Sequence, residues 1–179
     1  SRNDSKNQDQ PISLMQWTII IVLLFTICYL LFNLIKFWFA DKNYAYGQNL
    51  NRAGEHLQAY QYLQKAVATR NDPVFRDEFA LNNATLAVVY VNQKVIAKAT
   101  THAQEAINIS DRLIEEHQNN ILFWKTRVKI FYTLSQADLR YLPKALDAIQ
   151  KAADLAPNDA SIQYNLGVLY GQNNEVKKG

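Results

Sequence analysis

Apolar side chains are distributed along this chain in two different patterns. From Pro11 to Ile35 no residue is charged, and apolar side chains would cover every side of a helix formed by this stretch. A helix that is apolar all round must be buried on all sides, in a bilayer or in the core of a large protein. After Ala40, apolar residues recur at intervals of three and four, which is typical of amphipathic helices. The pattern predicts one membrane-spanning helix followed by packed amphipathic helices.

The apolar run is long enough to cross a bilayer. Spanning a hydrocarbon core of about 30 Å takes roughly 20 helical residues. Trp17 and Trp38 are 21 positions apart, so a helix places their rings roughly 32 Å apart, near the two interfaces where aromatic residues gather. A cleaved signal sequence has a shorter apolar core followed by small residues, whereas bulky residues occupy positions 37–39, and a buried helix of a soluble protein needs a larger core. We expect a transmembrane helix at residues 12–39 in the lipid bilayer, after a polar flank at residues 1–11.

The flanking charges leave the orientation of this span open. Arg2 and Lys6 precede the span, and Lys36, Lys42 and Arg52 follow it. Two basic residues against three do not decide an orientation by the positive-inside rule. The side of the membrane that holds the rest of the chain is therefore not predicted.

A repeated spacing of small and large residues organises the remainder of the chain. Small residues let two helices approach closely, and large ones fill the space between neighbouring hairpins. Residues Ala59, Leu63 and Ala66 have spacings of four and three, and the same spacings recur in Ala145, Ile149 and Ala152, before Pro157; Leu166, Gly167 and Tyr170 then follow. A helix–turn–helix unit of about 34 residues with these features is the tetratricopeptide repeat (TPR). The predicted fold class is all-α, with one transmembrane helix followed by a TPR-like α-solenoid of antiparallel helical hairpins; a generic helical bundle is the alternative.

The repeats divide the rest of the chain into four segments. Asp72-Pro73 is expected to end a helix, and Asn82–Asn83 and Asn119–Asn120 are expected to interrupt the helical pattern, the second pair as a break between helices. The loop at Ser135–Leu142 is longer than a standard repeat turn. The expected segments are a first TPR at 40–73, a degenerate and lengthened hairpin of two long helices at 74–120, a TPR-like hairpin at 121–157, and a truncated TPR at 158–179 whose second helix begins near Glu175.

Charge and composition exclude several functions. The formal net charge is +3 and basic residues are scattered among acidic ones, so no nucleic-acid partner is expected. His56, His102 and His117 are far apart in sequence, which favours solvated helix surfaces over a zinc site. Asp77 and Glu78 are adjacent and point apart on a helix, so we attribute them to the helix dipole. Without a Gly-rich phosphate loop or a Gly-x-Ser-x-Gly turn, we predict no catalytic residue, cofactor or metal in this segment.

The expected function is therefore binding. The first helices of stacked hairpins line a groove that can hold a protein or peptide, and residues there that packing does not require are the candidates. The candidate groove residues are Asn43, Asn51, Lys125, Lys129, Tyr132 and Asn165. Lys125 and Lys129, with Arg127 nearby, form a modest basic strip suited to an acidic partner; a solvated helix face is the simpler alternative for each.

The order of features after the span carries a family resemblance. The span leads into the aromatic segment Lys36–Lys42, and Tyr44-Ala-Tyr-Gly47 then opens a repeat with Asn51-Arg52-Ala-Gly54. This order resembles the C-terminal part, the last span and TPR tail, of bacterial O-antigen ligase/polymerase-type membrane proteins. Members of that family are polytopic enzymes that move lipid-linked glycans, and their catalytic arginines lie upstream of the last span. No catalytic residue can therefore be carried over to this sequence.

The resemblance implies a bacterial cytoplasmic membrane location and a non-catalytic role for this segment, within a parent that is itself an enzyme. Because the sequence begins at Ser1 and stops within a repeat, we expect it to be a piece of a longer protein. Two further readings remain open: a membrane-tethered interaction scaffold, and a single-pass TPR adaptor of a membrane assembly or secretion complex.

Overall fold

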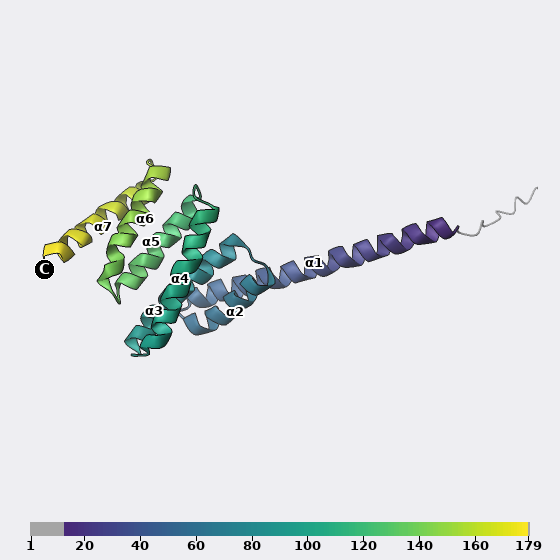
Figure 1. Ribbon diagram of the computed structural model, residues 1–179, viewed down its shortest axis with the longest axis horizontal. Helices are drawn as coiled ribbons and strands as arrows, with labels where there is room; N and C mark the ends of the chain where they lie inside the picture. Colours follow the sequence, from purple (N-terminus) through teal and green to yellow (C-terminus); the bar gives the residue numbers. More distant parts are fainter. Residues whose placement is uncertain (1–12, 179) are drawn as a thin grey trace, which may run out of the picture. The chain divides into compact units, whose positions relative to one another are not determined.

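The computed structural model describes residues 13–178, with side chains as far as Asn173. This part of the chain is all-α, as predicted (Figure 1). Its elements are α1 (Leu14–Arg52), α2 (His56–Thr69), α3 (Pro73–Asn92), α4 (Ile96–Glu116), α5 (Ile121–Ser135), the 3-10 helix η1 (Leu139–Tyr141), α6 (Leu142–Leu155) and α7 (Ala160–Lys178). The chain divides into two compact units, Ser1–Trp38 and Phe39–Gly179. The polar flank expected at residues 1–11 and the first position of the expected span lie outside the described residues.

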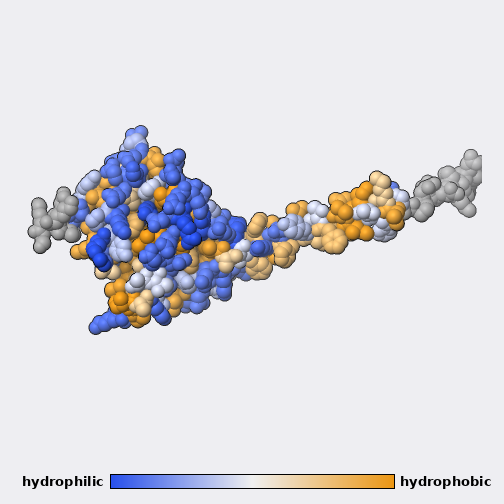
Figure 2. Space-filling model, viewed as in Figure 1, coloured by the Kyte–Doolittle hydropathy of each residue, from blue (hydrophilic) through white to orange (hydrophobic). Residues whose placement is uncertain are grey.

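The described part of the first unit is a single apolar helical segment. Every large apolar side chain from Leu14 to Trp38 is at least 39% exposed, and Figure 2 shows orange and pale atoms mixed along this segment. Among the described helices, α1 alone is both long and apolar enough to cross a membrane. By length and composition it suits a membrane anchor or a signal sequence.

Helix α1 continues without a break into the second unit. The sequence predicted a transmembrane helix ending at residue 39 and a first repeat starting at residue 40, but one helix runs from Leu14 to Arg52. The segment 36–44 contains neither glycine nor proline, so nothing in it favours a helix end. The last turns of α1, from Phe39 onward, therefore form the first helix of the first hairpin.

The second unit consists of TPR-like antiparallel hairpins: α1–α2, α3–α4 and α5–α6, followed by α7. The second helix of each hairpin buries small and large apolar residues at the predicted spacing. These residues are Ala59, Leu63 and Ala66 on α2, Ala99 and Ala106 on α4, and Ala145, Ile149 and Ala152 on α6, each no more than 4% exposed. One apolar core runs through the stack from Leu63 to Leu169.

Close helix approach explains the glycine in the first hairpin. Gly47 is buried on α1, and a Cβ atom there would lie 2.6 Å from Cγ of Leu63 on α2. The turn that follows contains Gly54 with φ of 84°, a left-handed conformation that glycine adopts without steric cost. Lys94 takes the same place in the α3–α4 turn, with φ of 62°.

Two boundaries differ from the sequence-based expectation. Helix α2 ends at Thr69, and Pro73 begins α3, where proline fits because a first-turn residue needs no amide hydrogen bond. Asn82 and Asn83 are polar positions inside the long helix α3, and both are buried. Helix α7 continues to Lys178 in one piece, where a second helix was expected from about Glu175. The break at Asn119–Asn120 does occur, because Asn120 caps the start of α5.

Candidate functional site

The first helices of the hairpins form one layer, joined by side-chain hydrogen bonds. Each successive pair, α1 to α3, α3 to α5 and α5 to α7, is linked once through a carboxylate. Asn51 Nδ2 donates to Glu78 at 2.8 Å, Thr126 Oγ1 donates to Asp77 at 2.7 Å, and Lys125 Nζ donates to Asp159 at 2.7 Å. We call these three contacts the polar ladder. They place residues of separate repeats on one surface, which local sequence periodicity cannot specify.

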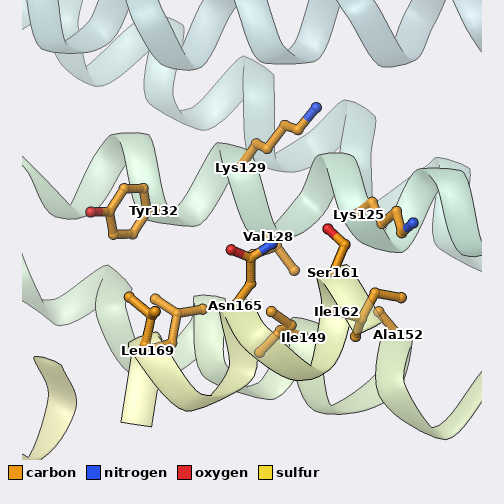
Figure 3. A pocket seen from close by; sticks show the side chains of 11 residues that line it. Lys125, Val128, Lys129, Tyr132, Ile149, Ala152, Ser161, Ile162, Asn165 and Leu169 are labelled. Atoms are coloured by element: carbon orange, nitrogen blue, oxygen red, sulfur yellow. The ribbon is translucent and has the colours of Figure 1, made fainter. Parts of the chain in front are cut away.

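A pocket of about 420 Å³ opens at the α5–α7 end of this layer (Figure 3). Its floor is apolar and is supplied by α5, α6 and α7: Val128, Ile149, Ala152, Ile162, Val168 and Leu169. Its rim is polar and consists of Lys125, Lys129, Tyr132, Ser161 and Asn165. No carboxylate lines the pocket among the described residues, so its polar groups are cations, hydroxyls and one amide.

The two rim lysines differ in their surroundings. Lys125 is paired with Asp159 at 2.7 Å, and this hydrogen bond lowers the pKa of the Asp159 carboxyl group. Asp159 also caps α7 by accepting from the backbone N–H of Ser161 at 3.0 Å. Lys129 is exposed and makes no ion pair within the described part of the chain. Lys129 is therefore the rim cation available to a ligand.

The hydroxyl and amide groups of the rim are also accessible. Asn165 lies exposed on α7, and Figure 3 shows its amide pointing toward α5. Tyr132 is 40% exposed and its hydroxyl accepts from Gln172 Nε2 at 3.4 Å. These groups can donate hydrogen bonds to carbonyl or carboxylate oxygens of a bound chain.

Asp77, on α3, accepts a hydrogen bond from Thr126 of α5, which is one residue from Lys125 of the pocket rim. Burial raises the pKa of its carboxyl group to about 7; Glu78 adds to the rise, while the Thr126 hydrogen bond and the charge of Lys129 oppose it. From the sequence, Asp77 and Glu78 were expected to interact favourably with the dipole of their helix. They do point apart, but neither lies in the first turn of α3, and each contacts a different neighbouring helix. Their role is contact between repeats, and this corrects the dipole interpretation.

Four of the six candidate groove residues meet at the pocket: Lys125, Lys129, Tyr132 and Asn165. The other two do not. Asn43 donates to the carbonyl of Phe39 in its own helix at 2.9 Å. Asn51 belongs to the polar ladder, where it also accepts from Asn82 Nδ2 at 2.6 Å.

The apolar floor of the pocket was not predicted from the sequence. Its residues have the same three- and four-residue spacing as core residues, so periodicity alone assigns them to packing. The described residues contain no group of three or more His, Cys, Asp or Glu that could hold a metal ion. The arrangement can bind a ligand through apolar contact and hydrogen-bond donation.

Comparison with solved structures finds several similar chains, among them a TPR-containing domain. Neither the protein-family models nor the curated proteins searched include a match to this sequence. The C-terminal TPR-containing domain of a Plasmodium falciparum protein described as an FK506-binding protein is 20% identical, with a TM-score of 0.47. The match covers 82% of this chain and 96% of that one.

Proposed function

We propose that this chain is a membrane-anchored TPR-like scaffold that binds a partner protein through the pocket between α5, α6 and α7. The observation that carries the proposal is the make-up of this pocket: an apolar floor, in which Val168 is 42% exposed, under a rim of donors and cations with no carboxylate. At protein interfaces, the side chains that contribute most to binding often fill pockets of this kind on the partner. The groups described suit a peptide segment with an apolar side chain beside an acidic one.

The apolar floor offers a direct test with a matched control. Val168 lines the pocket and is 42% exposed, whereas Tyr164 is 72% exposed on the same helix and does not line it. A random dodecapeptide phage library is panned against the full chain in lipid nanodiscs. Enriched peptides should bind Tyr164→Glu as they bind the original chain, and should bind Val168→Glu at least roughly tenfold more weakly, because a buried unpaired charge is costly.

Two outcomes count against this pocket. One is a library that shows no enrichment over nanodiscs without the chain. The other is a set of enriched peptides that bind Val168→Glu and the original chain equally, since such peptides contact another surface.

The anchoring part of the proposal rests on the exposed apolar segment of α1. A helix whose apolar side chains are exposed on all sides is unfavourable in water and favourable in lipid. The span places the TPR-like unit at a membrane surface, where a scaffold can recruit or position partners.

We also propose two kinds of protein to which this chain could belong. The resemblance in the segment after the span favours the non-catalytic tail of an O-antigen ligase/polymerase-like enzyme, and the second candidate is a single-pass adaptor of an assembly or secretion complex. The DNA sequence upstream of the codon for Ser1 distinguishes them. Further apolar spans there favour the enzyme tail, and a start codon directly before Ser1 rules it out in favour of the adaptor.

A further inference from the structure

A second cavity is formed by α2, α3 and α4. It has a volume of about 360 Å³ and shares no residue with the α5–α7 pocket. Tyr60, Tyr90 and His102 contribute aromatic rings to its lining, and Leu57 and Lys98 lie beside them. We call it the His102 cavity.

The three rings of the His102 cavity pack against one another. The imidazole of His102 is stacked on the ring of Tyr90, with the ring centroids 5.3 Å apart. The ring of Tyr60 is perpendicular to the imidazole, also with the centroids 5.3 Å apart. On the other side, Lys98 Nζ lies 5.2 Å from the centroid of the Tyr90 ring. Stacked and edge-to-face contacts are the favoured arrangements of aromatic pairs, so these contacts fix the orientation of the rings.

A buried amide determines which nitrogen of His102 carries the proton. Asn83 is fully buried, and its Nδ2 donates to the carbonyl of Phe79 at 2.8 Å. Its Oδ1 therefore faces His102 Nδ1, at 2.8 Å. An amide oxygen can only accept, so Nδ1 of His102 is the protonated nitrogen, and Nε2 of the neutral ring is a bare acceptor.

The Nε2 atom of His102 has no partner of its own. It makes no hydrogen bond within the described part of the chain. Because Nδ1 is turned toward the buried Asn83, Nε2 is on the edge of the ring that is available to the cavity. Burial lowers the pKa of His102; the charge of Glu105 opposes this and that of Lys98 adds to it. The ring is therefore neutral at pH 7, and Nε2 can accept a hydrogen bond.

These groups select the chemistry of a ligand. A carboxylate or a phosphate has no proton to donate to Nε2, and a cation is repelled by Lys98. A ring that carries a donor fits both parts of the cavity, because it can pack on Tyr60, Tyr90 and Leu57 while it donates to Nε2. Among side chains, the tyrosine O–H and the tryptophan N–H combine a large ring with a donor.

We propose that the His102 cavity binds a tyrosine or tryptophan side chain of a partner protein, which donates a hydrogen bond to His102 Nε2. Tyrosine and tryptophan are enriched among the residues that contribute most to binding at protein interfaces. This site gives the chain a second point of contact with a partner, and it does not depend on the proposed role of the α5–α7 pocket.

The state of the imidazole is the first test. The full chain, labelled with ¹⁵N-histidine in detergent micelles, is observed by NMR at about pH 7.5, where His102 is expected to be neutral. The nitrogen shifts distinguish a protonated ring nitrogen from a bare one. The His102 signals, identified by their loss in His102→Phe, should show a protonated Nδ1 and a bare Nε2.

A matched pair of soluble probes tests the ligand chemistry. N-acetyltyrosinamide should shift the His102 Nε2 signal saturably, and N-acetyltryptophanamide should do the same. N-acetylphenylalaninamide differs from the tyrosine probe only by the missing hydroxyl. It should bind about fivefold more weakly than N-acetyltyrosinamide, the usual value for one neutral hydrogen bond.

Paired variants locate the site. Ala97 lines the cavity, whereas Thr100 is exposed on the same helix and does not line it. Ala97→Phe should abolish binding of N-acetyltyrosinamide because the added ring occupies the cavity, and Thr100→Phe should leave binding unchanged. In His102→Phe, followed through the backbone amide signal of Thr101, the tyrosine and phenylalanine probes should bind equally.

Four results would overturn the proposal. They are a protonated Nε2 in the free chain, no shift of the His102 signals with either donor-bearing probe, equal binding of the tyrosine and phenylalanine probes to the original chain, and unchanged binding to Ala97→Phe. Each is read at the His102 cavity, so the outcome is independent of whether panned peptides bind the α5–α7 pocket.

Discussion

At the scale of single residues, burial between α3 and α5 raises the pKa of the Asp77 carboxyl group to about 7. The folded chain therefore holds this proton more tightly than the unfolded chain, in which aspartate titrates near 4. The stabilising contribution is fully present below about pH 4 and is lost as pH rises through 7. Above pH 7 the folded chain contains an ionised carboxylate whose burial is only partly offset by Thr126 and Lys129.

Replacing Asp77 by asparagine should remove this pH dependence. The asparagine Oδ1 can still accept the Thr126 hydrogen bond, and the side chain is neutral at every pH. We expect Asp77→Asn to be more stable than the original chain by about 2–4 kcal/mol at pH 8 and nearly equal to it at pH 4. Urea unfolding in detergent micelles, followed by circular dichroism at both pH values, measures the difference. An equal difference in stability between Asp77→Asn and the original chain at pH 4 and pH 8 would contradict a raised pKa at Asp77.

Two glycines on equivalent helices should respond in opposite ways to alanine. At Gly47 the added Cβ would lie 2.6 Å from Cγ of Leu63, whereas at Gly167 it would have no neighbour within 4 Å. Overpacking should make Gly47→Ala less stable by about 1–3 kcal/mol. Gly167→Ala should be more stable by about 0.5–1 kcal/mol, since alanine is the better helix former. Thermal unfolding of the two variants tests this, and a loss of stability in both would be the contrary result.

Single residues also show where sequence reasoning stops. The spacing of Ala59, Leu63 and Ala66 predicted burial, because a repeated helical period specifies one face. Asn83 was assigned to a polar interruption and His102 to a solvated helix surface. Asn83 is instead buried, and its Oδ1 lies 2.8 Å from His102 Nδ1. A buried polar side chain depends on a partner from another helix, and one sequence does not reveal that partner.

At the scale of secondary-structure elements, the break before α5 was predicted and has a defined cause. Asn120 Oδ1 accepts from the backbone N–H of Leu122 at 3.0 Å and so caps the helix. Asn120→Ala should cost about 1 kcal/mol, the usual value for a lost N-cap. The neighbouring Asn119 is exposed and makes no capping contact, so Asn119→Ala is the matched control. Equal melting temperatures for the two variants would show that the cap contributes nothing.

Helix ends were predicted less well where their cause is not local. In the α3–α4 turn, Lys94 has a left-handed backbone conformation. Lysine rarely adopts this conformation, so the sequence of the turn does not indicate it. Pro73 was assigned to the end of one helix and instead begins the next. Proline is compatible with both places, and Asp72, which accepts from the N–H of Val74 at 2.9 Å, decides between them.

At the scale of the whole molecule, the sequence predicted the order of parts better than the site. Apolar periodicity indicated an apolar N-terminal segment followed by helical hairpins. It made Lys125, Lys129, Tyr132 and Asn165 candidates for one binding surface. It did not predict the apolar residues that form the floor of the pocket. The floor requires three helices to meet, and their relative placement comes from the core and the polar ladder.

The proposed membrane span makes a prediction that separates it from a surface helix and from a cleaved signal. The three tryptophans of the chain are Trp17, Trp38 and Trp124. Variants with one tryptophan, the others replaced by phenylalanine, are reconstituted in lipids brominated at shallow or deep acyl positions. A helix crossing the bilayer holds Trp17 and Trp38 near the two interfaces, so shallow bromines should quench both more strongly than deep ones.

A tryptophan placed at the middle of the span should behave in the opposite way. Ile27→Trp, in a background without the other three, should be quenched most by deep bromines, because a spanning helix carries its centre through the hydrocarbon core. Trp124, on α5 of the other unit, should be quenched by neither. Shallow quenching at position 27 would indicate a helix lying in the interface, and a purified chain lacking residue 17 would indicate a removed signal. A membrane anchor requires shallow quenching at Trp17, deep quenching at position 27 and shallow quenching again at Trp38.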